Sequence, residues 1–127
     1  MNIDQNAYYS KEHEWVRKDG DQFVYGISDH AQDQLSDIVY VELPEPGDSF
    51  SAGDAMGVVE SVKAAADLYL PIAGEIVAVN DSLVDAPEVI NTDPFGEGWI
   101  VKFTASNTAE LEQLMSPEAY QQFVDKE

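Results

Sequence analysis

Turn-forming residues recur at short intervals through the middle of this chain. The clearest are Pro46-Gly47-Asp48, Ala52-Gly53-Asp54, Ala73-Gly74-Glu75 and Asn80-Asp81. Only short apolar runs fit between these turns, which leaves no room for a long helix. Closely spaced turns with short apolar runs between them are typical of small all-β sandwiches and barrels. The spacing therefore predicts a mainly β fold.

Runs of β-branched and aromatic residues predict strands on both sides of this region. Residues 14–16 and 22–27 are separated by a turn-forming segment, which predicts a hairpin. Residues 38–43 form another such run, which stops at Pro44 because proline cannot donate a hydrogen bond in a sheet. Residues 99–103 add a late strand after a glycine-containing turn.

Helices are expected at two places. Ser28 can cap a short helix over residues 30–35, since its side chain accepts a hydrogen bond from the first helical turn. Two short helices are expected over about residues 108–125, with Thr108 and Ser116 as caps. Their apolar residues recur at helical spacing: Leu111, Leu114, Met115, Tyr120, Phe123 and Val124.

One segment fits two kinds of structure. Residues 60–68 are rich in good helix formers, and four apolar side chains around them could share one helical face: Val59, Val62, Ala66 and Tyr69. Gly57 and Pro71 limit such a helix to about three turns, which is marginal without strong packing. The local pattern leaves helix and strand open here.

Size and charge narrow the class of protein. A chain of 127 residues suits one domain, residues 1–127, because single cores usually organise about 100–150 residues. The 25 acidic and 6 basic residues give a net charge of −19, which repels phosphate backbones and anionic membranes. The excess negative charge can instead steer encounters with partners that carry basic patches. We therefore expect no nucleic-acid partner and no membrane partner.

Three features that the sequence lacks narrow the class of protein further. The chain has no cysteine, so it offers no disulfide, thiolate nucleophile or sulfur metal ligand, and redox chemistry would need an attached group. Residues 1–6 lack the features of a signal peptide, and no apolar stretch approaches the roughly 20 residues that span a bilayer. These features predict a bacterial cytoplasmic protein, or a mitochondrial matrix protein if a transit peptide has been removed.

The segment at residues 57–76 closely resembles the modification site of the glycine cleavage H-protein family, and Lys63 lies where the family carries its lipoyl lysine. The resemblance continues in order and at family spacing through four further segments, at residues 11–15, 26–32, 37–44 and 93–99. It implies a lipoyl/biotinyl-type β-sandwich, a barrel-sandwich hybrid with short additional helices, notably at the C-terminus. Residues 57–76 would then form the lipoyl hairpin, with Lys63 at its tip. A tip would project the ammonium group beyond the protein surface.

Two related classes of carrier fit less well. Biotin carriers normally place methionine on both sides of the modified lysine, whereas the neighbours here are Val62 and Ala64. Lipoyl domains of 2-oxoacid dehydrogenases usually present Asp-Lys-Ala and lack the flanking motifs. A lipoyl domain of that kind remains the second alternative, and biotin is not expected.

The resemblance also implies a function. The family's lipoate, bound covalently as N6-lipoyllysine, takes the aminomethyl group of glycine from a pyridoxal-phosphate glycine decarboxylase. It passes that group to a tetrahydrofolate-dependent aminomethyltransferase and is reoxidised by dihydrolipoyl dehydrogenase. A lipoate-attaching enzyme is the fourth implied partner. The chain would thus be a monomeric carrier with no catalytic residue of its own.

Several other residues are candidates for a role around the arm. The resemblance suggests that Glu60 and Ser61, just before the lysine, help the lipoate-attaching enzyme to recognise the hairpin. Glu14 and Asp67 carry carboxylates that could receive the ammonium of a loaded arm folding back onto the protein. His30, in the family-like segment at residues 26–32, is a candidate for a functional surface.

Alternative chemistry finds little support in the sequence. Acid–base catalysis by Glu14, Glu42 or Asp67 would make the chain an enzyme, but no nucleophile and base occur in a recognisable arrangement. His13 and His30 show no spacing typical of metal ligands, so no metal site is predicted. The two tryptophans, Trp15 and Trp99, are expected in the core.

Overall fold

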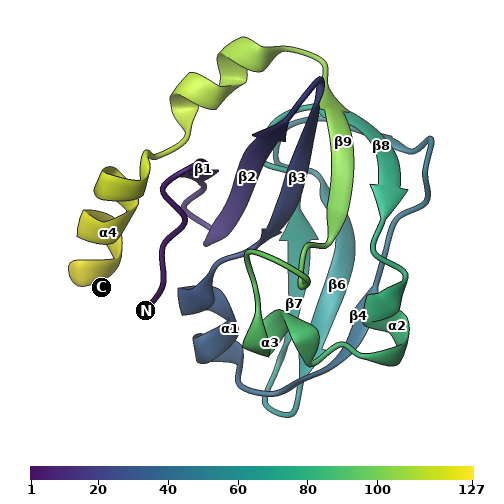
Figure 1. Cartoon of the computed structure of the whole chain (residues 1–127), viewed down its shortest axis with the longest axis vertical. Coiled ribbons are helices and arrows are strands. Elements are labelled where there is room, and N and C mark those ends of the chain that lie inside the picture. The colour runs from purple at the N-terminus through teal and green to yellow at the C-terminus, as the bar shows by residue number, and fades with distance from the viewer.

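The computed structural model describes residues 1–127 and contains two antiparallel sheets (Figure 1). The larger sheet has six strands in the spatial order β1 (Ala7–Tyr9), β2 (Glu14–Asp19), β3 (Gln22–Ile27), β9 (Val101–Ala105), β8 (Gly74–Val79) and β5 (Ser49–Phe50). The smaller sheet has three strands in the order β4 (Ile38–Glu42), β6 (Ala55–Ser61) and β7 (Ala65–Tyr69). The predicted β-sandwich with short helices is confirmed, as are the β2–β3 hairpin and the strand that stops before Pro44.

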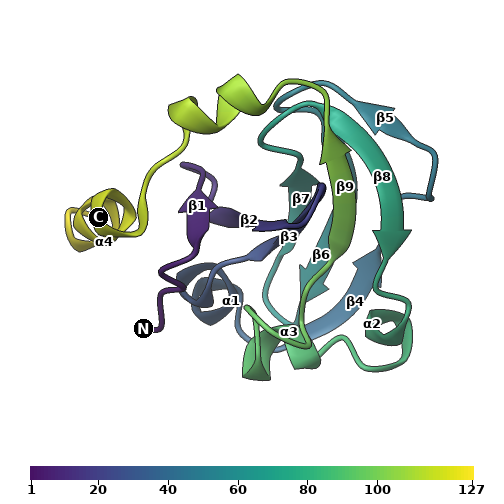
Figure 2. The same cartoon turned by 45° about the horizontal axis from the view of Figure 1, so that its top comes forward.

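The interior between the sheets holds the main core of 17 buried residues, and the strands curve around it (Figure 2). Val59 and Leu68 of the smaller sheet and Ile76 and Phe103 of the larger sheet are at most 1% exposed. Burial of each such side chain contributes roughly 1.5–3 kcal/mol relative to leaving it in water. The sandwich is therefore held together from both sides by ordinary apolar packing.

The segment with two possible readings is strand rather than helix. Val59 pairs with Val41 of β4 on one side and with Ala66 of β7 on the other. Alternation places Leu68 in the core while Asp67 points away, which is the period of a strand. Tertiary pairing thus overrides the helix propensity of the alanines. The hairpin formed by β6 and β7 ends at Tyr69, short of residue 76, because β8 leaves for the larger sheet.

The helices are α1 (Asp29–Leu35), α2 (Ser82–Asp85), α3 (Val89–Thr92), the 3-10 helix η1 (Thr108–Gln113) and α4 (Pro117–Asp125). The hydroxyl of Ser28 accepts the Ala31 N–H at the start of α1, and Ser116 caps α4 in the same way, as expected. Near residue 108 the sequence is partly misleading, because the helix is 3-10 and its cap is Asn107 rather than Thr108. No helix is both long and apolar enough to cross a membrane.

Helices α2 and α3 are not predicted by the sequence analysis. Each has only four residues, which is too short for helical periodicity to show in the sequence. They lie between β8 and β9 and each contributes one buried side chain to the main core, Leu83 and Ile90.

A second, smaller core lies on the other side of the larger sheet, under α4 and beside the chain's N-terminal segment (Figure 1). Trp15, Tyr9 and Tyr120 are fully buried there, which confirms the prediction for Trp15. Trp99 differs from expectation: it is only partly buried at the edge of this core, and the Lys102 ammonium lies 5.1 Å from the centre of its ring.

Candidate functional site

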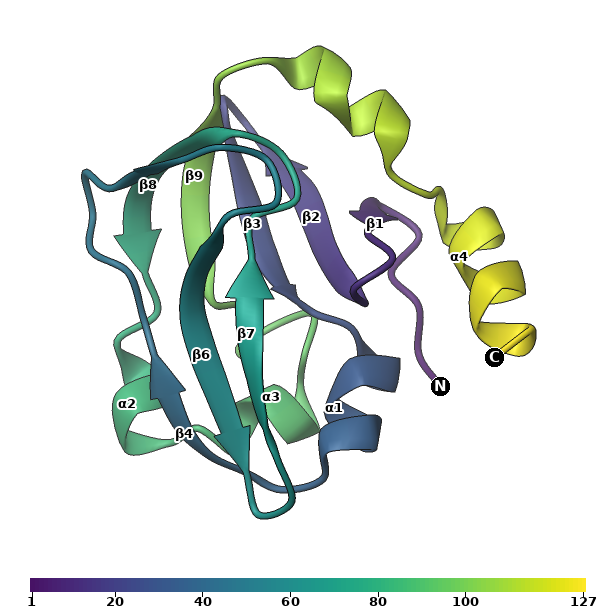
Figure 3. The same cartoon turned by 180° about the vertical axis from the view of Figure 1, so that it is seen from behind.

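Lys63 lies in the exposed turn between β6 and β7, and Figure 3 shows this turn at the lower end of the molecule. Ser61 holds the turn closed. Its N–H donates to the Ala64 carbonyl at 2.7 Å, and its hydroxyl oxygen accepts the N–H groups of Lys63 at 3.2 Å and Ala64 at 3.0 Å. A short, hydrogen-bonded turn presents the lysine in a defined place. The residues flanking Lys63 are also exposed, so another protein can approach it closely.

The lysine head rests on the C-terminal end of α1. Its Nζ donates a hydrogen bond of 2.8 Å to the Gln34 carbonyl, and the Val62 N–H donates one of 3.0 Å to the Asp37 carbonyl. Carbonyl groups at the end of a helix carry partial negative charge and favour a nearby cation. The hairpin tip is therefore docked against α1 through the residue that the family resemblance marks for modification.

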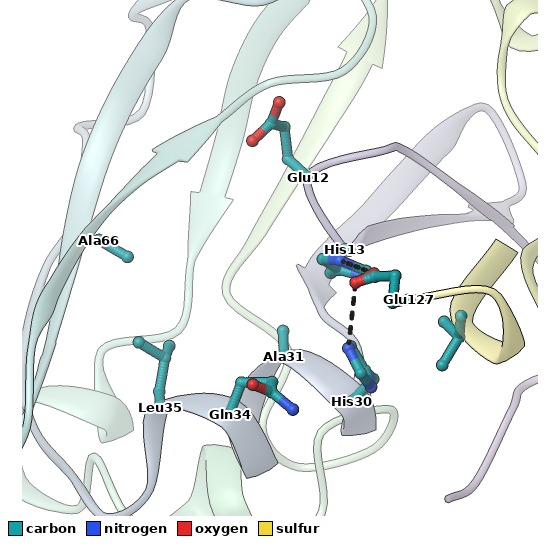
Figure 4. A pocket seen from close by; sticks show the side chains of 9 residues that line it. Glu12, His13, His30, Ala31, Gln34, Leu35, Ala66 and Glu127 are labelled. Carbon is teal, nitrogen blue, oxygen red and sulfur yellow. Dashed lines mark ion pairs between the residues drawn. The ribbon is translucent and has the colours of Figure 1, made fainter.

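A cavity of about 540 Å³ opens beside this contact, between α1, β7 and the end of α4 (Figure 4). Nine residues line it: Glu12, His13, His30, Ala31, Gln34, Leu35, Ala66, Val124 and Glu127. Its volume lies within the roughly 300–1,000 Å³ of pockets that hold small molecules. Gln34, whose carbonyl accepts the hydrogen bond from Lys63, also lines the cavity, although Lys63 itself does not.

His13, His30 and Glu127 come together in this cavity, although the sequence gives no sign of a cluster. The Glu127 carboxylate lies 3.0 Å from His13 Nε2 and 3.7 Å from His30 Nε2. Burial lowers the pKa of His13, and the nearby charge of Glu127 opposes that effect. His13 also has a left-handed backbone with φ of 65°, a conformation in which histidine is more common than most residues.

Glu14 occupies a different place, in the interior between the two sheets. It is 2% exposed, and its carboxylate accepts hydrogen bonds from the Tyr25 hydroxyl at 2.8 Å, the Tyr69 N–H at 2.7 Å and the Ser10 hydroxyl at 3.2 Å. Burial raises its pKa to about 7, and the hydrogen bonds from these partners reduce the rise. Glu14 also lines a second cavity of about 280 Å³, together with Glu12.

Asp67 and Glu60 are exposed on the outer faces of their strands. The Tyr69 hydroxyl lies 3.4 Å from the Asp67 carboxylate, and Asp67 lines neither of the two cavities. The structure therefore places His30 in the cavity that Gln34 also lines. Glu14 and Asp67 do not line this cavity. Glu60 lies next to Ser61 at the end of β6, near the lysine turn.

Several cavity residues escaped the sequence analysis. Glu12 lies in the family-like segment at residues 11–15, and Gln34 lies two residues after another such segment, so both could have been suspected. Glu127 gave no signal, because its place in the cavity depends on how α4 packs against distant strands. The cavity joins segments that are up to about a hundred residues apart in the chain.

Comparison with known proteins places this architecture in a family. Residues 7–127 match the family model described as "Glycine cleavage H-protein". A "Glycine cleavage system H protein" from Carboxydothermus hydrogenoformans is 50% identical over 125 residues, covering 98% of this chain and 96% of the relative. The protein of the same description from Salmonella arizonae is 52% identical over 127 residues, covering 99% and 98%. A crystal structure of a glycine cleavage system H protein from Mycobacterium marinum superposes with a TM-score of 0.89 at 36% identity, covering 97% of this chain and 99% of that one.

Proposed function

Because this chain belongs to the glycine cleavage H-protein family, we propose that it carries a lipoyl group on Lys63 and shuttles the aminomethyl group of glycine between enzymes. The observation that supports this most directly is the exposed lysine at the tip of a closed hairpin turn, with its amine hydrogen-bonded to the carbonyl of Gln34, a residue that lines the cavity. The donor enzyme would be the pyridoxal-phosphate glycine decarboxylase. The acceptor would be the tetrahydrofolate-dependent aminomethyltransferase, and dihydrolipoyl dehydrogenase would restore the oxidised arm.

The residues around Lys63 fit a lipoyl group bound as an amide. When bound, the group supplies a dithiolane that can accept and release the aminomethyl unit and can be reoxidised. The chain itself holds the attachment point in place through Ser61 and keeps bulky side chains away from it on the C-terminal side, where Ala64 and Ala65 follow. Forming the amide removes the lysine's positive charge, so its contact with the Gln34 carbonyl would weaken and the arm would be free to move.

The cavity next to α1 is the best place on this chain to shelter the arm between encounters. Ala31, Leu35 and Ala66 offer apolar surface to a methylene chain, whereas Glu12 offers a carboxylate to an ammonium. A group held in a partly enclosed site reacts with water more slowly than one in free solution. His30 belongs to this docking site, as the sequence analysis suggested.

Glu14 and Asp67 remain proposed partners of the loaded arm by a different route. Glu14 borders the second cavity, which shares Glu12 with the first, so an arm reaching beyond Glu12 would meet it. Asp67 would act from the outer face of β7. Release of the aminomethyl group in the absence of partner enzymes tests these roles: Glu14→Gln and Asp67→Asn should each shorten its retention. Retention equal to that of the unsubstituted protein in both variants would remove them from the docking site.

Glu60 and Ser61 are proposed to help the lipoate-attaching enzyme recognise the hairpin. Ser61 closes the turn through its hydroxyl, and Glu60 is exposed on β6 immediately before it. Ser61→Ala should slow modification by loosening the turn, and Glu60→Gln should slow it by removing an exposed charge. Modification rates measured by intact mass distinguish these effects from loss of the acceptor itself.

The decisive experiment is attachment of lipoate to the purified chain by a lipoate-attaching enzyme, followed by intact mass. The unsubstituted chain and Lys11→Arg, a control at another lysine, should each gain one lipoyl group. Lys63→Arg should remain at its original mass, because a guanidinium group cannot form the same amide. Lipoylation of Lys63→Arg at another lysine would refute the assignment.

A further inference from the structure

Two imidazoles and one carboxylate converge at one end of the cavity, and they come from three separate parts of the chain. His13 lies in the loop before β2, His30 in the first turn of α1, and Glu127 just after α4 (Figure 4). The Glu127 oxygens lie 3.0 Å and 3.7 Å from the Nε2 atoms of the two histidines. All three candidate donor atoms lie within 4.8 Å of one another.

We propose that His13, His30 and Glu127 form a binding site for a divalent transition-metal ion of the Zn²⁺ type. Zinc bonds to histidine nitrogen and to carboxylate oxygen are about 2.0–2.2 Å long, so donors around one ion are separated by about 3.3–3.5 Å in a tetrahedron. The separations of 3.0 Å and 3.7 Å lie on either side of that range. Side-chain movements of about an ångström would complete the geometry. Glu127 can make them because its side chain is 38% exposed.

The hydrogen bonds behind His13 are those expected of a metal ligand. Its Nδ1 lies 2.8 Å from the Tyr120 hydroxyl, which lies 2.7 Å from the Ser28 hydroxyl, and Tyr120 is fully buried. A histidine that binds metal through Nε2 needs its proton on Nδ1 and usually donates it to such a partner. The two hydroxyl groups can each donate or accept, so they accommodate this tautomer. Tyr120 therefore orients His13 with Nε2 directed toward Glu127.

Three protein ligands leave a coordination position for water. The ion would also join the end of α4 to α1 and to the loop before β2, where the Ser28 N–H already donates a hydrogen bond of 2.9 Å to the His13 carbonyl. The site would thus fasten the C-terminal helix across one end of the cavity. This role does not depend on lipoylation, so it can be tested on the unmodified chain.

The alternative is nonspecific binding of metal ions to the acidic surface, because a chain with a net charge of −19 attracts any divalent cation. The two modes differ in selectivity. Oxygen ligands alone suit Mg²⁺ and Ca²⁺, whereas imidazole strongly favours Zn²⁺, Ni²⁺ and Co²⁺. Excess Mg²⁺ should therefore block loose binding and leave the proposed site free.

The test is calorimetric titration of the untagged, unmodified chain with Zn²⁺ in excess Mg²⁺. We expect one Zn²⁺ per chain, with affinity lowered at least tenfold in His30→Gln and in Glu127→Gln. Tyr120→Phe keeps the aromatic packing but removes the hydrogen bond to His13, so it should weaken binding by roughly 10–100-fold. Glu12 lines the same cavity but is not one of the three ligands, so Glu12→Gln is the matched control for surface charge. Its Zn²⁺ affinity should be within about twofold of that of the unsubstituted chain.

Circular dichroism of each variant separates loss of a ligand from loss of the fold. If a substitution at a more buried position unfolds the chain, Glu127→Gln still tests the proposal. Co²⁺ in place of Zn²⁺ gives a second readout, since visible absorption reports nitrogen and oxygen ligation directly. Three results would overturn the proposal: no saturable Zn²⁺ binding in excess Mg²⁺, equal affinity in the His30 and Glu127 variants and the unsubstituted chain, or an equal loss in the Glu12 control.

Discussion

Replacing Glu14 by glutamine should change how the stability of this protein depends on pH. The carboxyl group lies between the two sheets, and burial raises its pKa from 4.5 to about 7. In the unfolded chain the same group is solvated and ionises near its ordinary pKa. Between these two pH values the folded protein keeps a proton that the unfolded chain has released.

The sign and size of the effect follow from that difference. Where the folded state binds more protons than the unfolded state, the free energy of unfolding falls as pH rises. Each pH unit between the two pKa values corresponds to about 1.4 kcal/mol, so ionisation of Glu14 should cost about 3 kcal/mol of stability across the window from pH 4.5 to about 7. Glutamine cannot ionise and lacks this slope. Its amide oxygen can still accept from Tyr25 and Tyr69, which both donate to Oε2, but its NH2 group would replace the Oε1 that accepts from the Ser10 hydroxyl.

Urea unfolding, followed by the fluorescence of buried Trp15 at several pH values and constant ionic strength, measures the effect. The difference in unfolding free energy between Glu14→Gln and the unsubstituted protein should move by about 3 kcal/mol in favour of the variant as pH rises through the window. Glu42→Gln, at an exposed position on β4, controls for the loss of one charge and should follow the unsubstituted protein. Parallel curves for Glu14→Gln and the unsubstituted protein would refute the reasoning.

Further predictions concern packing, charge and partner encounters. Gly26→Ala should lower stability by roughly 1–3 kcal/mol in urea unfolding, because its Cβ would lie 2.7 Å from the Trp15 ring; unchanged stability would show that the ring can shift freely. Leu68→Ala should cost about 2–5 kcal/mol in the same assay, since Leu68 is 1% exposed in the main core. Lipoylation should take the net charge from −19 to about −20 and move the chain slightly toward the anode on native gels. Association rates with the partner enzymes should fall markedly as salt rises, because screening acts over roughly 8 Å at 0.15 M ionic strength; rates indifferent to salt for every partner would exclude electrostatic steering.

Much of the architecture could be predicted from local sequence because its signals are local. Frequent turns left room only for short elements, and the β-branched run of β4 stopped at Pro44. Ser28 and Ser116 marked the helix starts that the structure shows. Each of these depends on neighbours a few residues away, so a linear pattern carries the information.

Long-range contacts determined the features that sequence analysis left open or missed. Residues 60–68 became strand because β6 lies between β4 and β7 and pairs its backbone with both. Glu14 acquired its raised pKa because the second sheet covers it and excludes water.

Lys63 could be recognised in the sequence because its neighbours in the chain carry the family motif. The cavity near it could not be recognised, because its lining residues come from distant parts of the chain. The hydrogen bond between His13 and Tyr120 joins residues 107 positions apart, and Glu127 reaches His30 only because α4 packs where it does. Chain neighbours determine turns, caps and strand tendencies. The convergence of His13, His30 and Glu127 depends instead on the packing of the whole fold, in which each buried side chain constrains the placement of the next.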